Sequence, residues 1–217
     1  MKKPAVIFDL DGVLINSVPV HYKSVKQLFS EIGINDYTFN EMLEYDVTRG
    51  AMNLIPRVLK DRGVNGNVKA LLLRKKQLMK GKHIPLMPGV KQLIKKLKKE
   101  GYTIAVASNG TKEFVLGILK KHKINKYFSC VLTGNDIKHH KPNPEIYKKM
   151  AKCLKVKPRD CIVIEDSRDG TVAGKRAGMT VIGHKVKIEK QDLKRADVRV
   201  SSMRKITPEF IEHVYKN

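Results

Sequence analysis

The sequence has no long apolar run and contains few cysteines and few aromatic residues. The lack of a long apolar run excludes a class of protein. No apolar segment is long enough to cross a membrane, so we expect no membrane-spanning helix. The N-terminal MKKPAVIF resembles the start of a signal peptide, but Asp9 and Asp11 interrupt the apolar region too early for one. The remaining composition, with 41% hydrophobic residues over 217 positions, is typical of a globular protein with one large domain or two unequal ones.

The three cysteines, Cys130, Cys153 and Cys161, show no C-x-x-C spacing. We therefore expect free thiols and a cytoplasmic protein.

Acidic residues are scarce, because 21 Asp and Glu face 44 Lys and Arg, which gives a net charge of +23. Such a charge is compatible with nucleic-acid contact. The lysines are spread along the chain, however, and in KQLIKKLKKEG (91–101) they alternate with an apolar helical stripe. We favour a solvated basic surface that attracts phosphorylated metabolites, with nucleic acid bound only through generic contacts, and we expect a monomer.

Strand-like apolar runs alternate with amphipathic helical patterns over most of the chain, which predicts an α/β fold with a doubly wound parallel sheet of the Rossmann-like kind. The expected strands are 5–9, 103–108, 129–133, 161–165, 180–182 and 198–200. The expected helices between and after them are 89–100, 112–122, 144–154, 169–177 and 208–215.

Residues 15–86 break this alternation, because they contain helical patterns and no convincing strand. Gly33, Gly63 and Gly81 fall where such helices could end. We therefore expect a catalytic core domain, formed by 1–14 and 87–217, with an all-helical cap domain, 15–86, inserted after the first strand.

Polar residues follow the predicted strands where each one ends. If the strands are parallel, these residues meet at one edge of the sheet, where open α/β sheets bind their ligands. The residues are Asp9, Asp11, Ser108, Asn109, Lys141, Glu165 and Asp166.

Carboxylates, a hydroxyl and a lysine in one crevice suit a phosphoryl group and a hard cation. Mg²⁺ prefers oxygen ligands, which Asp9, Asp166 and the backbone carbonyl of Asp11 could supply. Asp9 would be the nucleophile that forms an aspartyl-phosphate, and Asp11 would be the general acid and base. Ser108 and Lys141 would hold the phosphate oxygens. Asn109 could donate to phosphate, cap the next helix, or do both.

Four segments, DLDGV, ASN, KPNPEIY and VIEDSRDG, occur in an order that resembles the haloacid dehalogenase-like superfamily. The likeness is to its helical-cap branch, which includes β-phosphoglucomutase and phosphoglycolate-type phosphatases. It implies the same roles for the core residues and adds Glu165 near the magnesium ion, directly or through water. The acid at position 11 argues for phosphoryl transfer, since dehalogenase members lack it. Asn16 stands where related sequences often have Asp, so hydrogen bonding at the hinge into the cap is expected to differ.

Two cap residues are candidate substrate contacts. His21 begins the first cap helix, where mutase-like relatives use a histidine to gate the acid and base; the alternative is a histidine on the helix surface. Arg49 could reach a second anionic group of the substrate or could simply lie on the surface.

The sequence therefore predicts an enzyme, a Mg²⁺-dependent phosphatase that hydrolyses a sugar phosphate or a phosphoglycolate-type metabolite through an aspartyl-phosphate. One alternative is a β-phosphoglucomutase-type mutase, which returns the phosphoryl group to the sugar. A remoter alternative is a basic nucleic-acid-binding protein on a hydrolase fold.

Overall fold

The computed structural model describes residues 3–44, 51–186 and 191–216. The chain divides into two compact units. The first contains Met1–Asn16, Leu86–Val186 and Asp192–Asn217, and most of the second is Ser17–Pro85. Each unit is described by itself. The domain boundaries expected from the sequence remain a prediction about which segments fold together.

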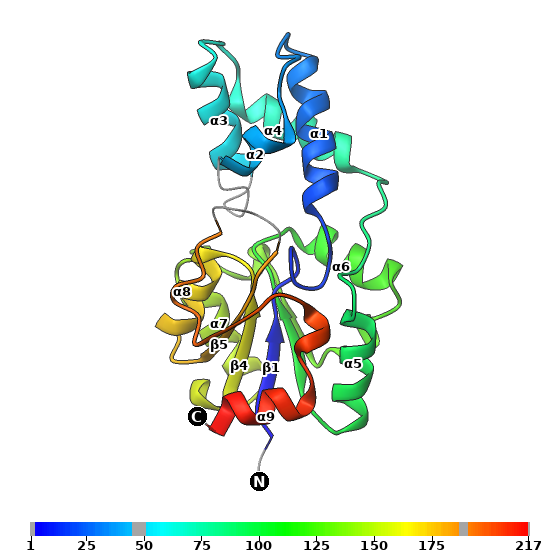
Figure 1. Cartoon of the computed structure of the whole chain (residues 1–217), viewed down its shortest axis with the longest axis vertical. Helices are drawn as coiled ribbons and strands as arrows, with labels where there is room; N and C mark the ends of the chain where they lie inside the picture. Colours follow the sequence, from blue (N-terminus) through cyan, green and yellow to red (C-terminus); the bar gives the residue numbers. More distant parts are fainter. Residues whose placement is uncertain (1–2, 45–50, 187–190, 217) are drawn as a thin grey trace. The chain divides into compact units, whose positions relative to one another are not determined.

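A six-stranded sheet forms the centre of the first unit (Figure 1). Every neighbouring pair of strands is parallel, in the order β3-β2-β1-β4-β5-β6. The strands are β1 (Ala5–Phe8), β2 (Ile104–Ala107), β3 (Cys130–Leu132), β4 (Cys161–Glu165), β5 (Thr180–His184) and β6 (Val198–Val200). The predicted doubly wound α/β fold is confirmed, and β1 has a central place because its four residues, AVIF, are buried on both faces.

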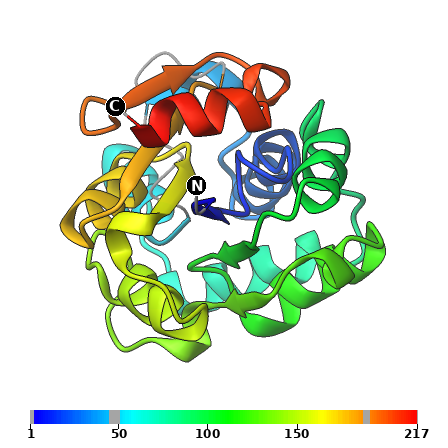
Figure 2. The ribbon, with the colours of Figure 1, turned by 90° about the horizontal axis from the view of Figure 1, so that it is seen from below.

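Helices flank this sheet, as the view from the end where β1 begins shows (Figure 2). Helices α7 and α8 pack against one face through a core that includes Ile7, Val163, Met150 and Ala173. Figure 1 shows α5 on the other side of the sheet. The helices of this unit are α5 (Val90–Lys99), α6 (Lys112–Lys121), α7 (Glu145–Cys153), α8 (Arg168–Arg176) and α9 (Pro208–Lys216). The described residues of this unit also form short 3-10 helices, which are η2 (Asn125–Tyr127), η3 (Gly134–Asp136), η4 (Pro158–Asp160) and η5 (Met203–Lys205).

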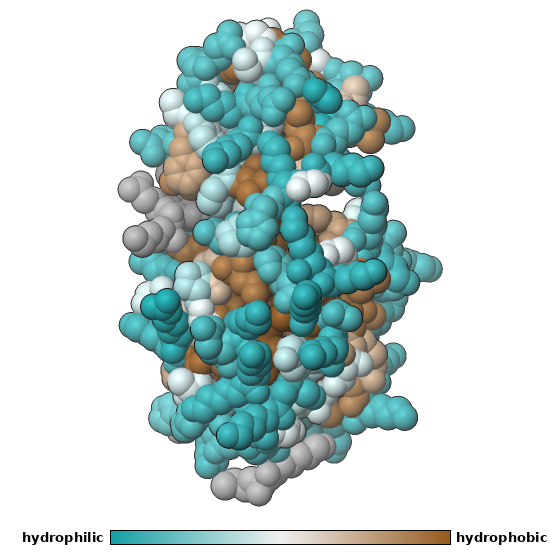
Figure 3. Space-filling view, turned by 90° about the vertical axis from the view of Figure 1, so that its right-hand side faces the viewer, coloured by the Kyte–Doolittle hydropathy of each residue, from teal (hydrophilic) through white to brown (hydrophobic). Residues whose placement is uncertain are grey.

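The lysine-rich helix α5 shows how this chain accommodates its charge. Val90, Leu93, Ile94 and Leu97 are buried, as their spacing predicts for one face of a helix. The lysines between them are mostly exposed. Figure 3, which shows the right-hand side of the molecule in Figure 1, is covered mainly by hydrophilic side chains with smaller hydrophobic areas between them.

Helices are the only regular elements among the described residues of the second unit, and its core gathers around Phe29, Tyr37 and Ile55. The Phe29 and Tyr37 rings pack edge to face, with a centroid separation of 4.8 Å. The unit consists of α1 (Val18–Ser30), α2 (Phe39–Glu44), α3 (Ala51–Asp61) and α4 (Val68–Met79).

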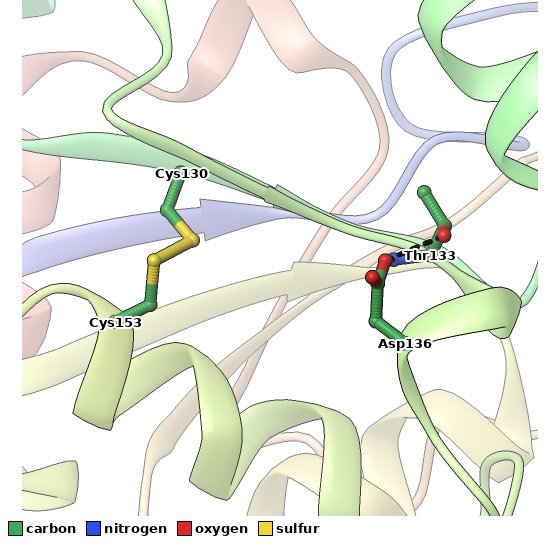
Figure 4. The surroundings of a disulfide bond; sticks show 4 residues. All are labelled: Cys130, Thr133, Asp136 and Cys153. Atoms are coloured by element: carbon green, nitrogen blue, oxygen red, sulfur yellow. Dashed lines mark hydrogen bonds between the residues drawn. A yellow bond between two sulfur atoms is a disulfide. The ribbon is translucent and has the colours of Figure 1, made fainter.

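The prediction that all three cysteines are thiols is wrong for two of them. Cys130, at the start of β3, forms a disulfide with Cys153, at the end of α7 (Figure 4). The two residues lie 23 positions apart and meet because α7 packs on β3. Cys161 is outside the disulfide, and its Sγ donates to the Lys157 carbonyl. The cysteine argument for a cytoplasmic location is therefore lost.

In the described part of the chain, none of the helices is both long and apolar enough to cross a bilayer.

Candidate active site

The carboxyl ends of the central strands bring the predicted core residues together. Asp9 directly follows β1, Ser108 follows β2, and Asp166 follows β4. Since β2, β1 and β4 are neighbours in register, these three residues lie side by side at one edge of the sheet. All three are buried, with exposed fractions between 2% and 8%. The neighbouring strands thus concentrate two carboxylates and a hydroxyl in one crevice.

The segment after β1 turns back on itself to present Asp11. Gly12 adopts a φ of +71°, a conformation that favours glycine. Its N–H donates to the Ile15 carbonyl at 2.9 Å, and Leu10 O accepts from the N–H groups of Leu14 and Ile15. We refer to residues 9–12 as the Asp9–Gly12 turn. Asp11, in this turn, is only partly buried, in contrast to Asp9.

Lys141 connects the acids of the site to one another. Its Nζ donates to Asp9 Oδ1 at 2.6 Å, to Glu165 Oε1 at 2.6 Å and to the Ala107 carbonyl at 2.9 Å. An ammonium group has three hydrogens, so these contacts account for all of its donors. The Lys141 side chain is only 4% exposed, and its charge is balanced locally by the two carboxylates.

Glu165, the last residue of β4, is fully buried and accepts hydrogen bonds on both oxygens. Oε1 accepts from Lys141 and from the Tyr147 hydroxyl, the latter at 2.7 Å. Oε2 accepts from the backbone N–H groups of Asp166 and Ser167 and from Ser167 Oγ. This carboxylate therefore helps to orient Lys141, which it contacts together with Asp9.

Tyr147 is a site residue that the sequence analysis missed. It lies in α7, is buried, and has no special signal in the sequence beyond its place in KPNPEIY. Its ring centroid is 5.0 Å from Lys141 Nζ, so it contacts the lysine through its face and Glu165 through its hydroxyl.

The side chains of Ser108 and Asn109 mainly accept hydrogen bonds from backbone N–H groups in this structure. Ser108 Oγ accepts from the Gly110 N–H at 3.0 Å, and Asn109 Oδ1 accepts from the Lys141 N–H at 3.3 Å. The idea that Asn109 caps the next helix is wrong, because Thr111 is the N-cap of α6 and its side chain accepts from the Phe114 N–H.

Burial of several acids in one crevice shifts their protonation. Burial raises the pKa of Asp9, Lys141 lowers it, and Glu165 and Asp11 raise it again, so that it reaches about 8. Burial, Glu165 and Asp9 likewise hold the pKa of Asp166 well above its ordinary value. Burial lowers the pKa of Lys141, but Asp9 and Glu165 raise it more, so it lies well above its usual value and the lysine is charged. A further cation would relieve the crowding of negative charge.

The arrangement of these acids fits a metal ion. One oxygen each from Asp9, Glu165 and Asp166 lies within 4.8 Å of the others, and all three residues are buried. A cluster made only of oxygen donors suits a hard divalent cation.

In the helical unit, His21 is part of a polar contact between two helices. Lys75 Nζ, on α4, lies 2.7 Å from His21 Nδ1, on α1. His21 is partly buried and Lys75 is buried, so neither is a simple surface residue. Arg49, the other cap residue expected to contact substrate, lies outside the described residues.

The comparisons with known proteins agree with this geometry. A family model described as haloacid dehalogenase-like hydrolase matches residues 6–184. The chain belongs to this family. It is therefore an enzyme of the haloacid dehalogenase-like hydrolases, as the four motifs had indicated, and the site just described lies within the matched region.

The relatives include both phosphatases and a mutase. The chain is 28% identical over 177 residues to a phosphorylated carbohydrates phosphatase of Thermotoga maritima, which covers 81% of this chain and 82% of that protein. It is 32% identical over 187 residues to a β-phosphoglucomutase of Bacillus subtilis, covering 82% of each chain. Among solved structures, a family IA hydrolase from Entamoeba histolytica superposes with a TM-score of 0.83 and 25% identity, over 99% of this chain and all of the other.

Proposed function

We propose that this protein is a Mg²⁺-dependent phosphatase that hydrolyses a small phosphorylated metabolite through an aspartyl-phosphate on Asp9. The observation that carries the proposal is the contact of Lys141 with both Asp9 and Glu165. A charged lysine that holds one oxygen of a buried aspartate leaves the other carboxylate oxygen to attack phosphorus. The names of the relatives support a phosphorylated carbohydrate or a related small acid as the substrate class.

Asp9, Asp166 and the backbone carbonyl of Asp11 are the ligands that we propose for Mg²⁺. Glu165 belongs to the same acidic cluster, but its oxygens already accept from Lys141, Tyr147 and Ser167. We therefore assign Glu165 to the positioning of Lys141. When bound, the ion supplies positive charge next to the phosphate and relieves the repulsion between the buried acids.

The two half-reactions follow from the positions of the acids. Asp9 attacks phosphorus, the bond to the leaving oxygen breaks, and Asp11 donates a proton to that oxygen. Asp11 then removes a proton from a water molecule, which attacks the aspartyl-phosphate and releases inorganic phosphate and free Asp9. Partial exposure of Asp11 suits this role, because it must meet both the leaving group and water.

Lys141, Ser108 and Asn109 are the proposed phosphate-binding residues, and Lys141 acts through its charge because its three hydrogens are already engaged. Lys141 neutralises charge on the transferring group, while the Ser108 hydroxyl and the Asn109 amide can donate to its oxygens. Their backbone contacts to Gly110 and Lys141 would hold them in place.

Phosphate release from a panel of phosphorylated metabolites, including phosphoglycolate and β-glucose 1-phosphate, tests the proposal. We expect turnover with Mg²⁺, none with a chelator, and a loss of at least about a thousandfold in Asp9→Asn. Asp36→Asn, which alters an exposed acid of the helical unit, is the matched control and should keep full activity. A folded wild-type protein that binds Mg²⁺ but releases no phosphate from any substrate would refute the proposal.

A phosphosugar mutase is the second candidate, and the contact between His21 and Lys75 favours it. A polar pair between two cap helices is a suitable device for holding a sugar phosphate during its reorientation, and one relative is a β-phosphoglucomutase. Formation of glucose 6-phosphate from β-glucose 1-phosphate, without free phosphate, would establish the mutase. His21→Asn should then reduce isomerisation more strongly than phosphate release from p-nitrophenyl phosphate. His21 and Arg49 stay candidate substrate contacts.

We further propose a monomer in the cytoplasm, with nucleic acid bound only through generic contacts to the basic surface. The absence of a membrane-crossing helix among the described residues is compatible with this location.

A further inference from the structure

His184 makes a buried contact with the Asp9–Gly12 turn, and it belongs to none of the four sequence motifs. It is the last residue of β5 and is 2% exposed. Its Nδ1 lies 2.7 Å from the Gly12 carbonyl oxygen, across 172 residues of sequence. In the sheet, Gly183 pairs with Glu165, so His184 stands one residue further along, at the edge where the acids gather.

This hydrogen bond can have only one direction. A carbonyl oxygen accepts and cannot donate, so the His184 Nδ1 must carry the hydrogen. Burial lowers the pKa of His184, which keeps the imidazole neutral near pH 7. The tautomer is therefore set by the partner.

Gly12 is constrained from a second side by Asp166. A Cβ atom placed on Gly12 would overlap Asp166 Oδ2, so the glycine backbone lies directly against that carboxylate. The Gly12 N–H is engaged with Ile15 O, and its carbonyl with His184. A shift of Gly12 would therefore move Asp11, its neighbour in the chain, relative to Asp166.

We propose that His184 is a positioning residue, whose Nδ1–H holds the Gly12 carbonyl and thereby fixes Asp11 against Asp166. The expected effect of His184 on catalysis rests on the proposed function, whereas its effect on the position of Asp11 rests on the geometry. A buried polar ring at a strand end is costly unless it is hydrogen-bonded, and an apolar residue would fill the place without that cost. Ile182, two residues earlier on the same face of β5, is such an apolar residue.

Three variants separate positioning from packing. His184→Leu keeps bulk and removes the donor, whereas His184→Asn retains an N–H donor close to the place of Nδ1. Ile182→Val is the matched control, because it removes a buried methylene from the same face of the same strand and leaves the Gly12 carbonyl paired. Each variant is measured for kcat and KM with p-nitrophenyl phosphate, for the Mn²⁺ dissociation constant by electron paramagnetic resonance, and for Tm.

We expect His184→Leu to lose at least about tenfold in kcat, with KM changed by less than about twofold, and to weaken Mn²⁺ binding at least about threefold. His184→Asn should recover most of both losses. Ile182→Val should lower Tm and leave kcat and Mn²⁺ affinity unchanged. Should the leucine variant not fold, His184→Gln takes its place, since its amide reproduces the position of Nε2 and not of Nδ1.

The inference is overturned if the leucine variant matches the wild type in kcat and Mn²⁺ affinity, if His184→Asn loses as much as His184→Leu, or if Ile182→Val loses as much as either. A wild-type protein that binds Mn²⁺ but hydrolyses no phosphomonoester would refute the proposed function alone, and the Mn²⁺ affinities of the variants would then decide the role of His184. A wild-type protein that binds no Mn²⁺ would refute both.

Discussion

Lys141 Nζ donates to Asp9 Oδ1 at 2.6 Å, although 132 residues separate them in the sequence. The same nitrogen holds Glu165 at the same distance, so one buried cation is the counter-ion of two buried acids. Removal of the lysine would leave two acids without their counter-ion in a place that water does not reach. Under the proposed function, catalysis and stability therefore depend on the same side chain.

Lys141→Met should abolish phosphate release and lower the free energy of unfolding by about 3–5 kcal/mol near pH 7, which is the usual cost of breaking a buried ion pair. In chelator the stability loss should be larger at pH 9 than at pH 7, because Asp9, whose pKa is about 8 beside Lys141, ionises over that range and needs the lysine as its counter-ion. Steady-state kinetics and urea unfolding at the two pH values measure these effects.

Lys149→Met is the control for this prediction, because Lys149 is 45% exposed and pairs with Glu145 on the surface of α7. Its loss should cost less than about 1 kcal/mol and leave kcat unchanged. Equal effects of the two substitutions would contradict the role that we give to Lys141.

Metal binding should remove the pH dependence of stability that the buried acids cause. In chelator, the folded state holds a proton on Asp9 up to a pKa of about 8, while the unfolded chain releases it near 3.8. Between these values the native state binds more protons than the unfolded state, so the free energy of unfolding falls as pH rises. Asp166, whose pKa is also raised, acts in the same direction. Saturating Mg²⁺ favours the ionised acids and should remove the decline.

Urea unfolding at pH 5 and pH 8, with Mg²⁺ and with chelator, measures this linkage. Asp9→Asn is the matched variant, because it removes one of the two titrating groups and should make the decline in chelator shallower, leaving the part that Asp166 causes. A decline of the same size with and without Mg²⁺ would count against a metal site at these acids.

The sheet and the core acids were predictable from the sequence because their signals are local. A short apolar strand such as Ala5–Phe8 is recognisable by itself, and parallel strands carry the residues that follow them to one edge. Asp9, Ser108 and Asp166 needed no knowledge of packing beyond this rule.

The residues that were missed owe their roles to contacts across the fold. Tyr147 reaches Glu165 from a helix, and His184 reaches Gly12 across nearly the whole chain. A histidine or tyrosine of this kind has no spacing pattern that separates it from an ordinary core residue. The disulfide between Cys130 and Cys153 was missed for the same reason, since the packing of α7 on β3 brings the two together.

The disulfide should stabilise the protein without affecting catalysis. It closes a segment spanning 23 positions, and a loop of that size corresponds to about 3 kcal/mol of unfolding free energy. Cys130 is the first residue of β3, so it lies at the amino end of the parallel strands, whereas the site lies at their carboxyl ends. Cys153→Ser should therefore lower stability by about that amount and leave kcat unchanged at temperatures where it stays folded.

Reduction provides the control for the disulfide. A dithiol reductant should destabilise the wild-type protein to the level of Cys153→Ser and have little effect on the variant. Alkylation of the unfolded, unreduced protein should modify one cysteine of the three. Modification of all three would show that the disulfide does not form.

Two glycine-to-alanine substitutions in helices should have opposite effects. A Cβ atom on Gly170, in the first turn of α8, would overlap the Glu165 carboxyl group, whereas one on Gly117, in α6, would meet no atom within 4 Å. Gly117→Ala should stabilise the protein by about 0.5–1 kcal/mol, the usual gain at an unobstructed helical position, and leave kcat unchanged. Gly170→Ala should push Glu165 away from Lys141, reducing both stability and kcat, the latter by at least about tenfold. Thermal unfolding and phosphate-release kinetics of the two variants measure this contrast, and a fully active Gly170→Ala would mean that Lys141 keeps its position without Glu165.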